Sequence, residues 1–150
     1  MEKKRYKKFL LTLFISFLIM YTVMFLNVAS INHVYFSLTR LYMALLMVAP
    51  MGILMLFMMK SRFNNKRLNK IILISGIVIF VLALFFLRTQ TFIQDEQYMK
   101  AMVPHHSSAI LTSQEAEIND SEVKDLSTEI IETQEREISL MKELLNKINS

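Results

Sequence analysis

Cysteine is absent from this chain of 150 residues, and glycine and proline occur only twice each. Without cysteine the protein can form neither disulfides nor thiolate metal sites, and methionine, which occurs twelve times, is the remaining soft side chain. The scarcity of glycine and proline removes most turn signals. The sequence therefore predicts an all-α protein.

Acidic residues are nearly missing from the first ninety positions, where Glu2 stands alone beside twelve lysines and arginines. Residues 91–150 hold twelve acids and five basic residues, a net charge of 5 − 12 = −7. The basic residues flank apolar runs in short clusters, which is a membrane pattern. We therefore expect no nucleic-acid partner, despite a sequence pI near 9.4. Two parts are predicted: a membrane anchor over 1–90 and a separate domain over 91–150.

Three uncharged apolar runs cover residues 9–26, 41–59 and 71–87. Each approaches the ~20 residues that a helix needs to cross about 30 Å of hydrocarbon. We predict three transmembrane helices at about 9–29, 38–59 and 69–90. A cleaved signal peptide is the alternative for the first run. No clear small-residue cleavage site follows it and two further runs come later, which favours an uncleaved anchor.

Loop charge predicts the orientation of these helices. Five basic residues precede the first run and five fill the connection at 60–70, whereas residues 30–39 contain none. The positive-inside rule then places the N-terminus and the 60–70 connection in the cytoplasm. The acidic segment is expected outside a bacterial-type inner or plasma membrane, at the end of a multi-pass chain.

Methionines recur every four residues through the second run, at Met43, Met47, Met51, Met55 and Met59. A thioether ladder for Cu(I) is one interpretation, and flexible apolar packing is the other. Packing is favoured because no charged or imidazole side chain joins the stripe, and the same absence argues against a channel or transporter. His33, alone in the outer connection, is one further possible ligand, but a lone histidine at a membrane interface is interpreted as an ordinary polar anchor.

The acidic segment shows helical spacing of apolar residues over 95–116 and 122–148. Asn119 suits a helix end and Asp120 an N-cap, so the two helices should form an antiparallel hairpin. Pro104 is expected to kink the first helix. Two helices bury little surface, so a dimer that completes a four-helix bundle is predicted.

Polar residues and methionines of the two helices are expected at the same level along this hairpin, within an otherwise apolar seam. One face of the second helix is expected to form the seam, with Val123, Ile130, Gln134, Glu137, Met141, Leu144 and Ile148. Gln134 and Glu137 interrupt this apolar stripe, and a turn centred near 120 puts Glu137 beside His105 and Gln134 beside His106. Met141 falls level with the methionines of the first helix. The candidate site residues are Met99, Met102, His105, His106, Gln134, Glu137 and Met141.

Thioether and imidazole ligands together favour Cu(I) over hard cations, and they resist the oxidation that cysteine would suffer outside the cytoplasm. Glu137 could be a ligand or could fix a histidine tautomer. Alternatively, the histidines are surface residues, Glu137 pairs with Lys100 or Arg136, and the hairpin is an oligomerisation module. No Glu-x-x-His pair or placed nucleophile is present, so an enzyme is not expected.

The run Met102-Val103-Pro104-His105-His106, followed by Gln134, Glu137, Ile138 and Met141, resembles domain of unknown function family 305 over about residues 92–146. This resemblance implies a ferritin-like helical fold and copper binding in tolerance or trafficking. The ligands that it implies are Met102, His105, His106, Gln134, Glu137 and Met141, with Met99 as a further candidate. Only three methionines lie in this domain, which favours one copper site per hairpin over high-capacity storage.

Overall fold

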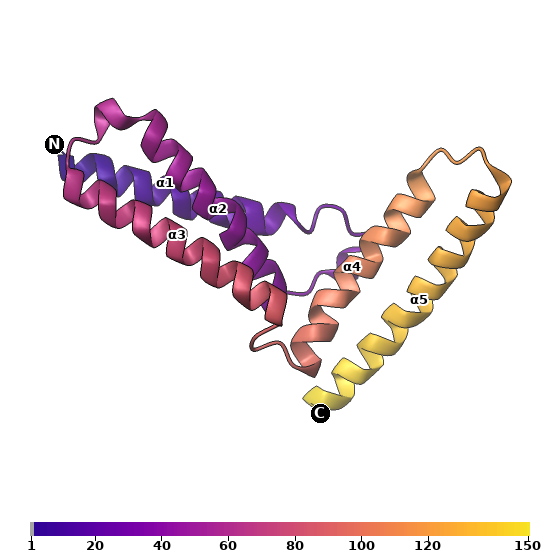
Figure 1. The fold of residues 1–150 in the computed structure, drawn as a ribbon. Helices are drawn as coiled ribbons and strands as arrows, with labels where there is room; N and C mark the ends of the chain where they lie inside the picture. Colours follow the sequence, from indigo (N-terminus) through magenta and orange to yellow (C-terminus); the bar gives the residue numbers. More distant parts are fainter. Residues whose placement is uncertain (1) are drawn as a thin grey trace. The chain divides into compact units, whose positions relative to one another are not determined.

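The computed structural model describes residues 2–150, and every regular element among them is helical (Figure 1). The all-α class is thus confirmed. The α-helices are α1 (Glu2–Val23), α2 (Leu38–Met58), α3 (Lys66–Thr89), α4 (Asp95–Glu115) and α5 (Ser121–Asn149). Two short 3₁₀ helices lie in the connections, η1 (Ile31–His33) after α1 and η2 (Lys60–Arg62) after α2.

Helices α1, α2 and α3 are long and apolar enough to cross a membrane, with 22, 21 and 24 residues. Helix α1 begins at Glu2, seven residues before the predicted span, and ends at Val23. The difference has a physical reason: lysine and arginine are good helix formers, so the helix extends through the basic cluster that precedes the apolar run. The apolar run marks where hydrocarbon could be crossed, and it does not mark where the helix starts.

The chain divides into two compact units. The first unit comprises the residues up to Met24 together with Thr39–Phe92, and the second comprises Phe25–Leu38 together with Ile93–Ser150. The connection between α1 and α2 therefore groups with α4 and α5, not with the helices that it joins.

An aromatic cluster at one end of the first unit holds α1 against the segment that follows α2. Phe63 is buried, with its ring centroid 5.0 Å from that of Tyr6 and 5.3 Å from that of Phe9. The Tyr6 hydroxyl lies 2.6 Å from Asn69 Oδ1, and Asn69 Nδ2 donates to the Phe63 carbonyl at 2.8 Å. Because these bonds join α1, the 59–65 connection and α3, this end of the unit is cross-linked by polar groups.

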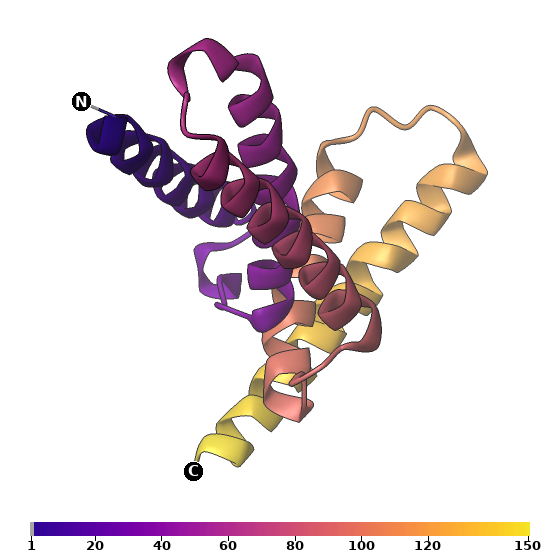
Figure 2. The same ribbon diagram turned by 60° about the vertical axis from the view of Figure 1, so that its left-hand side comes forward.

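Helices α4 and α5 lie side by side and run in opposite directions (Figures 1 and 2). Asp120 caps α5, as expected, with its Oδ1 accepting from the Val123 amide at 3.0 Å. Near the turn, the Ser127 hydroxyl donates to the Ser113 carbonyl at 3.1 Å. Pro104 lies inside α4 and is buried; it cannot donate a backbone hydrogen bond there.

Candidate functional site

Packing between α4 and α5 fixes which faces of the two helices meet. Val103 and Ile110 of α4 and Ile138 of α5 form a buried cluster, with exposed fractions of 0%, 3% and 3%. Ile131 and Met141 pack against this cluster. Large apolar side chains therefore occupy the centre of the contact, and the candidate site residues lie beside it.

The contact face of α5 differs from the predicted seam. Ser127, Ile138 and Leu145 are the buried residues of α5, whereas Val123 and Ile148, which the predicted stripe included, are about half exposed. The predicted and the observed faces lie about one position apart around the helix. The predicted face holds residues 130, 134, 137, 141, 144 and 148, and the observed face holds residues 127, 131, 138 and 145. Gln134, Glu137 and Met141 consequently flank the contact and are half-buried.

His106 and Glu137 form the polar contact of the site. The distance between His106 Nε2 and Glu137 Oε2 is 2.8 Å, the imidazole side chain is 11% exposed and the carboxylate side chain is 46% exposed. The predicted neighbour of Glu137 was His105, and this prediction is wrong. The contact faces lie about one position from the predicted ones, and adjacent helical residues point about 100° apart, so His106 replaces His105 as the neighbour of Glu137.

The second ring nitrogen of His106 has no partner. His106 Nδ1 is buried and makes no hydrogen bond. If Nε2 carries the proton that is donated to Glu137, Nδ1 of the neutral ring holds a free lone pair. This is the arrangement in which a carboxylate fixes the tautomer of a histidine that binds a metal through its other nitrogen.

Three methionines share a cavity with this pair. Its volume is about 540 Å³, and the thioethers come from both helices, Met99 and Met102 from α4 and Met141 from α5. Met99 is buried and the other two are half-buried. The remaining lining residues are His106, Glu137, Asp95, Tyr98, Leu140, Leu144 and Ile148. Five of the seven candidate residues therefore line one cavity, which we call the thioether pocket.

The two other candidates lie apart from the thioether pocket. His105 is exposed and lines a smaller hollow of about 310 Å³ with Ser108 and Ile130. Its ring centroid is 5.9 Å from that of His106. Gln134 is half-buried and does not line the pocket, but its Oε1 is buried without a hydrogen-bond partner.

Histidine and carboxylate side chains alone do not make a metal site here. Within residues 2–150, no three side chains of histidine, cysteine, aspartate or glutamate gather closely enough to hold an ion. Any metal bound in the thioether pocket would thus depend on methionine sulfur, which suits a soft ion.

The family called Domain of unknown function (DUF305) matches residues 86–147. An uncharacterized protein of Acanthamoeba polyphaga mimivirus is 39% identical over 120 residues, which is 79% of this chain and 77% of that protein. The chain belongs to the DUF305 family. No solved structure matches it.

The DUF305 stretch contains α4 and nearly all of α5, and hence every candidate site residue. The similarity to the viral protein is longer than this stretch, so it also includes residues outside the DUF305 match. The connection Phe25–Leu38 lies outside the stretch, although it groups with α4 and α5 in the second unit.

The connection Phe25–Leu38 of this DUF305 protein was not predicted to contact α4. Ser107 of α4 is fully buried, and its Oγ accepts from the Ala29 amide at 2.8 Å and lies 2.9 Å from His33 Nδ1. Tyr35 packs against the cluster of Val103, Ile110 and Ile138. The signal available in the sequence was the apolar and aromatic content of this connection, which includes Phe25, Tyr35 and Phe36, since large apolar side chains are usually buried against other parts of a protein.

His33 is therefore more than the polar anchor expected from the sequence. Burial lowers the pKa of its imidazole below the usual 6.5, and the charge of Lys142 lowers this pKa further. At neutral pH the ring is uncharged and can exchange a hydrogen bond with the Ser107 hydroxyl.

Proposed function

We propose that this protein is a membrane-tethered copper-binding protein, which holds Cu(I) in the thioether pocket for copper tolerance or trafficking. The support is the convergence of three thioethers from two helices on one cavity that also contains an imidazole. Neutral sulfur and nitrogen ligands stabilise Cu(I) without requiring a charged partner. The net charge of −7 over residues 91–150 would raise the local concentration of cations.

The unpartnered Nδ1 of His106 is the observation that carries the proposal. A buried polar atom without a hydrogen bond is costly unless a ligand satisfies it. Glu137 holds the opposite nitrogen at 2.8 Å and orients the ring. In this proposal the ligands are His106, Met99, Met102 and Met141, and Glu137 positions His106.

A competition titration with a coloured Cu(I) chelator, on the full chain in detergent, tests the pocket. The triple variant Met102→Leu/Met141→Leu/His106→Ala should bind Cu(I) at least about a hundredfold more weakly, since altering the partners of a metal ligand already costs 10–100-fold. The matched control is Met43→Leu/Met47→Leu/His105→Ala, which removes the same three groups at exposed positions.

The control also decides between two sets of ligands. Equal weakening in both triple variants would show that exposed methionines or His105 bind the ion, and the thioether pocket would be rejected. Glu137→Gln should weaken binding by about tenfold if Glu137 acts through His106. An unchanged affinity in Glu137→Gln would reject its positioning role.

The membrane placement belongs to the same proposal. Helices α1, α2 and α3 would cross the membrane with the clusters at Lys3–Lys8 and Lys60–Lys70 inside and α4 and α5 outside. Because the chain lacks cysteine, single substitutions report the topology directly. In intact cells, a membrane-impermeant maleimide should label Asn119→Cys and should leave Asn64→Cys unlabelled until the membrane is opened.

A second candidate function is self-association through α4 and α5. Tyr98, Leu140 and Ile148 line the rim of the thioether pocket and are 54%, 55% and 53% exposed. Exposed large apolar residues at one rim are typical of a surface that another chain covers. If the hairpin dimerises into a four-helix bundle, light scattering in detergent should give twice the protomer mass, and Leu140→Glu should halve it. A monomer with and without copper would reject this function.

A further inference from the structure

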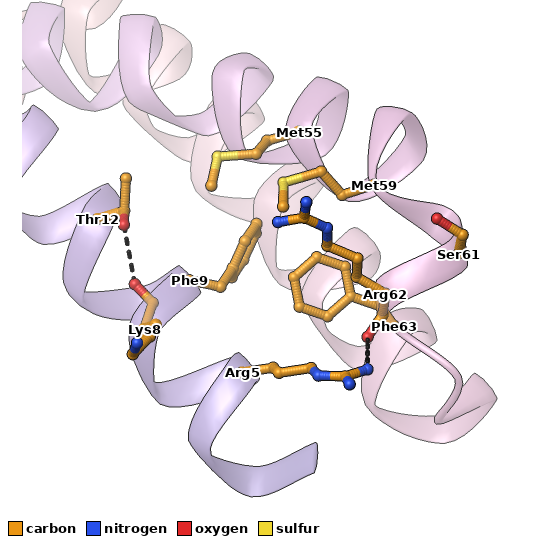
Figure 3. Close-up of a pocket in the computed structure, with 9 residues that line it drawn as sticks. All are labelled: Arg5, Lys8, Phe9, Thr12, Met55, Met59, Ser61, Arg62 and Phe63. Atoms are coloured by element: carbon orange, nitrogen blue, oxygen red, sulfur yellow. Dashed lines mark hydrogen bonds between the residues drawn. The ribbon is translucent and has the colours of Figure 1, made fainter. Parts of the chain in front are cut away.

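A second cavity, of about 540 Å³, lies in the first unit between α1 and the end of α2 (Figure 3). It is unrelated to the thioether pocket, which belongs to the second unit. We call it the basic pocket. Its lining residues are Arg5, Lys8, Phe9, Thr12, Met55, Met59, Ser61, Arg62 and Phe63.

Three cations and no acid line the basic pocket. The cations are Arg5 and Lys8 from α1 and Arg62 from η2. Arg5 Nη1 donates to the Arg62 carbonyl at 3.2 Å, which leaves most of its guanidinium N–H groups for another acceptor. The nearest carboxylate along the chain is that of Glu2, three residues before Arg5 on α1, and Glu2 does not line the pocket.

The other wall of the basic pocket is apolar. Figure 3 shows the Arg62 side chain extending from η2 toward Met59 and Phe9. Phe9 is buried, and Met55 and Met59 are half-buried and pack against the aromatic cluster of Tyr6, Phe9 and Phe63. The pocket thus joins cationic groups to an apolar surface, on walls that the ring contacts and the hydrogen bonds of Asn69 hold in place.

We propose that the basic pocket binds the phosphate headgroup of an anionic glycerophospholipid in the cytoplasmic leaflet. Guanidinium groups match phosphate oxygens in a two-pronged geometry, and the lysine adds a third positive charge. The apolar wall would contact the glycerol and the first methylenes of the lipid, which a free phosphate lacks. Basic pockets between membrane helices on the cytoplasmic side commonly bind such lipids. The proposal rests on the membrane placement given above, and not on copper binding.

Native mass spectrometry of the full chain, released from lipid nanodiscs of equal phosphatidylglycerol and phosphatidylcholine, tests this site. The wild type should retain phosphatidylglycerol selectively. The variant Arg5→Gln/Lys8→Gln/Arg62→Gln should lose most of that preference, since it removes every cation that lines the pocket and with them the charge-assisted hydrogen bonds to the phosphate. The matched control is Lys66→Gln/Arg67→Gln/Lys70→Gln, which removes three exposed cations outside the pocket and should keep the preference.

One further variant and three possible outcomes distinguish a lipid site from the alternatives. Arg62→Lys keeps the charge but loses the planar fork, and it should show an intermediate preference. Equal loss in both triple variants would indicate diffuse surface charge and would overturn the site. Displacement of phosphatidylglycerol by millimolar inorganic phosphate would identify a soluble anion instead of a lipid. A chain that does not co-elute with the discs would overturn the membrane placement and this site together, whereas the copper titration would be unaffected.

Discussion

The two units are built from the same element, the α-helix, yet they bury their large apolar side chains in different places. In the first unit the large buried residues Phe9, Leu56 and Phe63 gather at one end. Small residues such as Ala44 and Gly52 are buried along α2, while Phe85 and Ile77 are about half exposed. In the second unit large apolar residues such as Ile138 are buried. In lipid, helices gain little by hiding leucine and isoleucine, and small residues allow them to approach closely. The apolar length of α1, α2 and α3 and the buried small residues of α2 are both compatible with such surroundings.

The largest effect is expected in the second unit. Ile138→Ala removes the α5 member of the buried cluster and should destabilise α4 and α5 by about 2–5 kcal/mol. Hydrogen exchange measured by mass spectrometry should be faster in α4 and α5 than in the wild type, and the exchange rates in α3 should be unchanged. Leu126→Ala, at a position of α5 that is 55% exposed and outside the thioether pocket, is the control and should change little. Equal faster exchange in α3 would show that the units unfold together.

The corresponding change in the first unit is at its close helix contact. A Cβ added at Gly52 would lie 3.0 Å from Leu13 Cδ1, so Gly52→Leu must displace the Leu13 side chain or separate α1 from α2 and should cost about 1–3 kcal/mol. Unfolding in a mixed detergent series measures this change. Thr22→Leu adds a similar side chain at an exposed position and should be neutral. A Gly52→Leu variant as stable as the wild type would show that α1 and α2 do not need a small residue at this contact.

A smaller effect is expected at the start of α5. Asp120→Ala removes the acceptor of the Val123 amide and should destabilise the second unit by about 1 kcal/mol. Glu129→Ala, exposed in the middle of α5, is the control. Chemical denaturation that gives equal midpoints for the two variants would contradict the capping role.

The smallest effect is a pH dependence of the connection in the second unit. The pKa of His33 is lowered in the folded state, so the unfolded state binds its proton more readily. The contact with Ser107 should therefore be fully stable above about pH 6.5, the usual value, and weaken as the pH falls below it. Exchange of amides 25–38 at pH 7.5 and pH 5, corrected for intrinsic rates, measures this. His33→Gln, which cannot titrate, should remove the dependence.

Particular residues show how much of the fold and of the site could be predicted from the sequence. The all-helical class and the cap at Asp120 follow from local rules, and both are confirmed. The thioether pocket holds five of the seven candidates, yet Glu137 contacts His106 and not His105. Helical spacing places a face only to within about one position, and one position is 100°, enough to exchange adjacent histidines. Copper binding itself stays a prediction.

The sequence by itself determined the elements, because helix formation, capping and apolar length depend on neighbours along the chain. Only the tertiary structure decided what covers each helix. Ser107 shows the difference, since its buried hydroxyl is satisfied by Ala29 and His33, which lie more than seventy positions earlier. A contact between such distant segments leaves no period in the sequence, because it depends on where the whole chain places them.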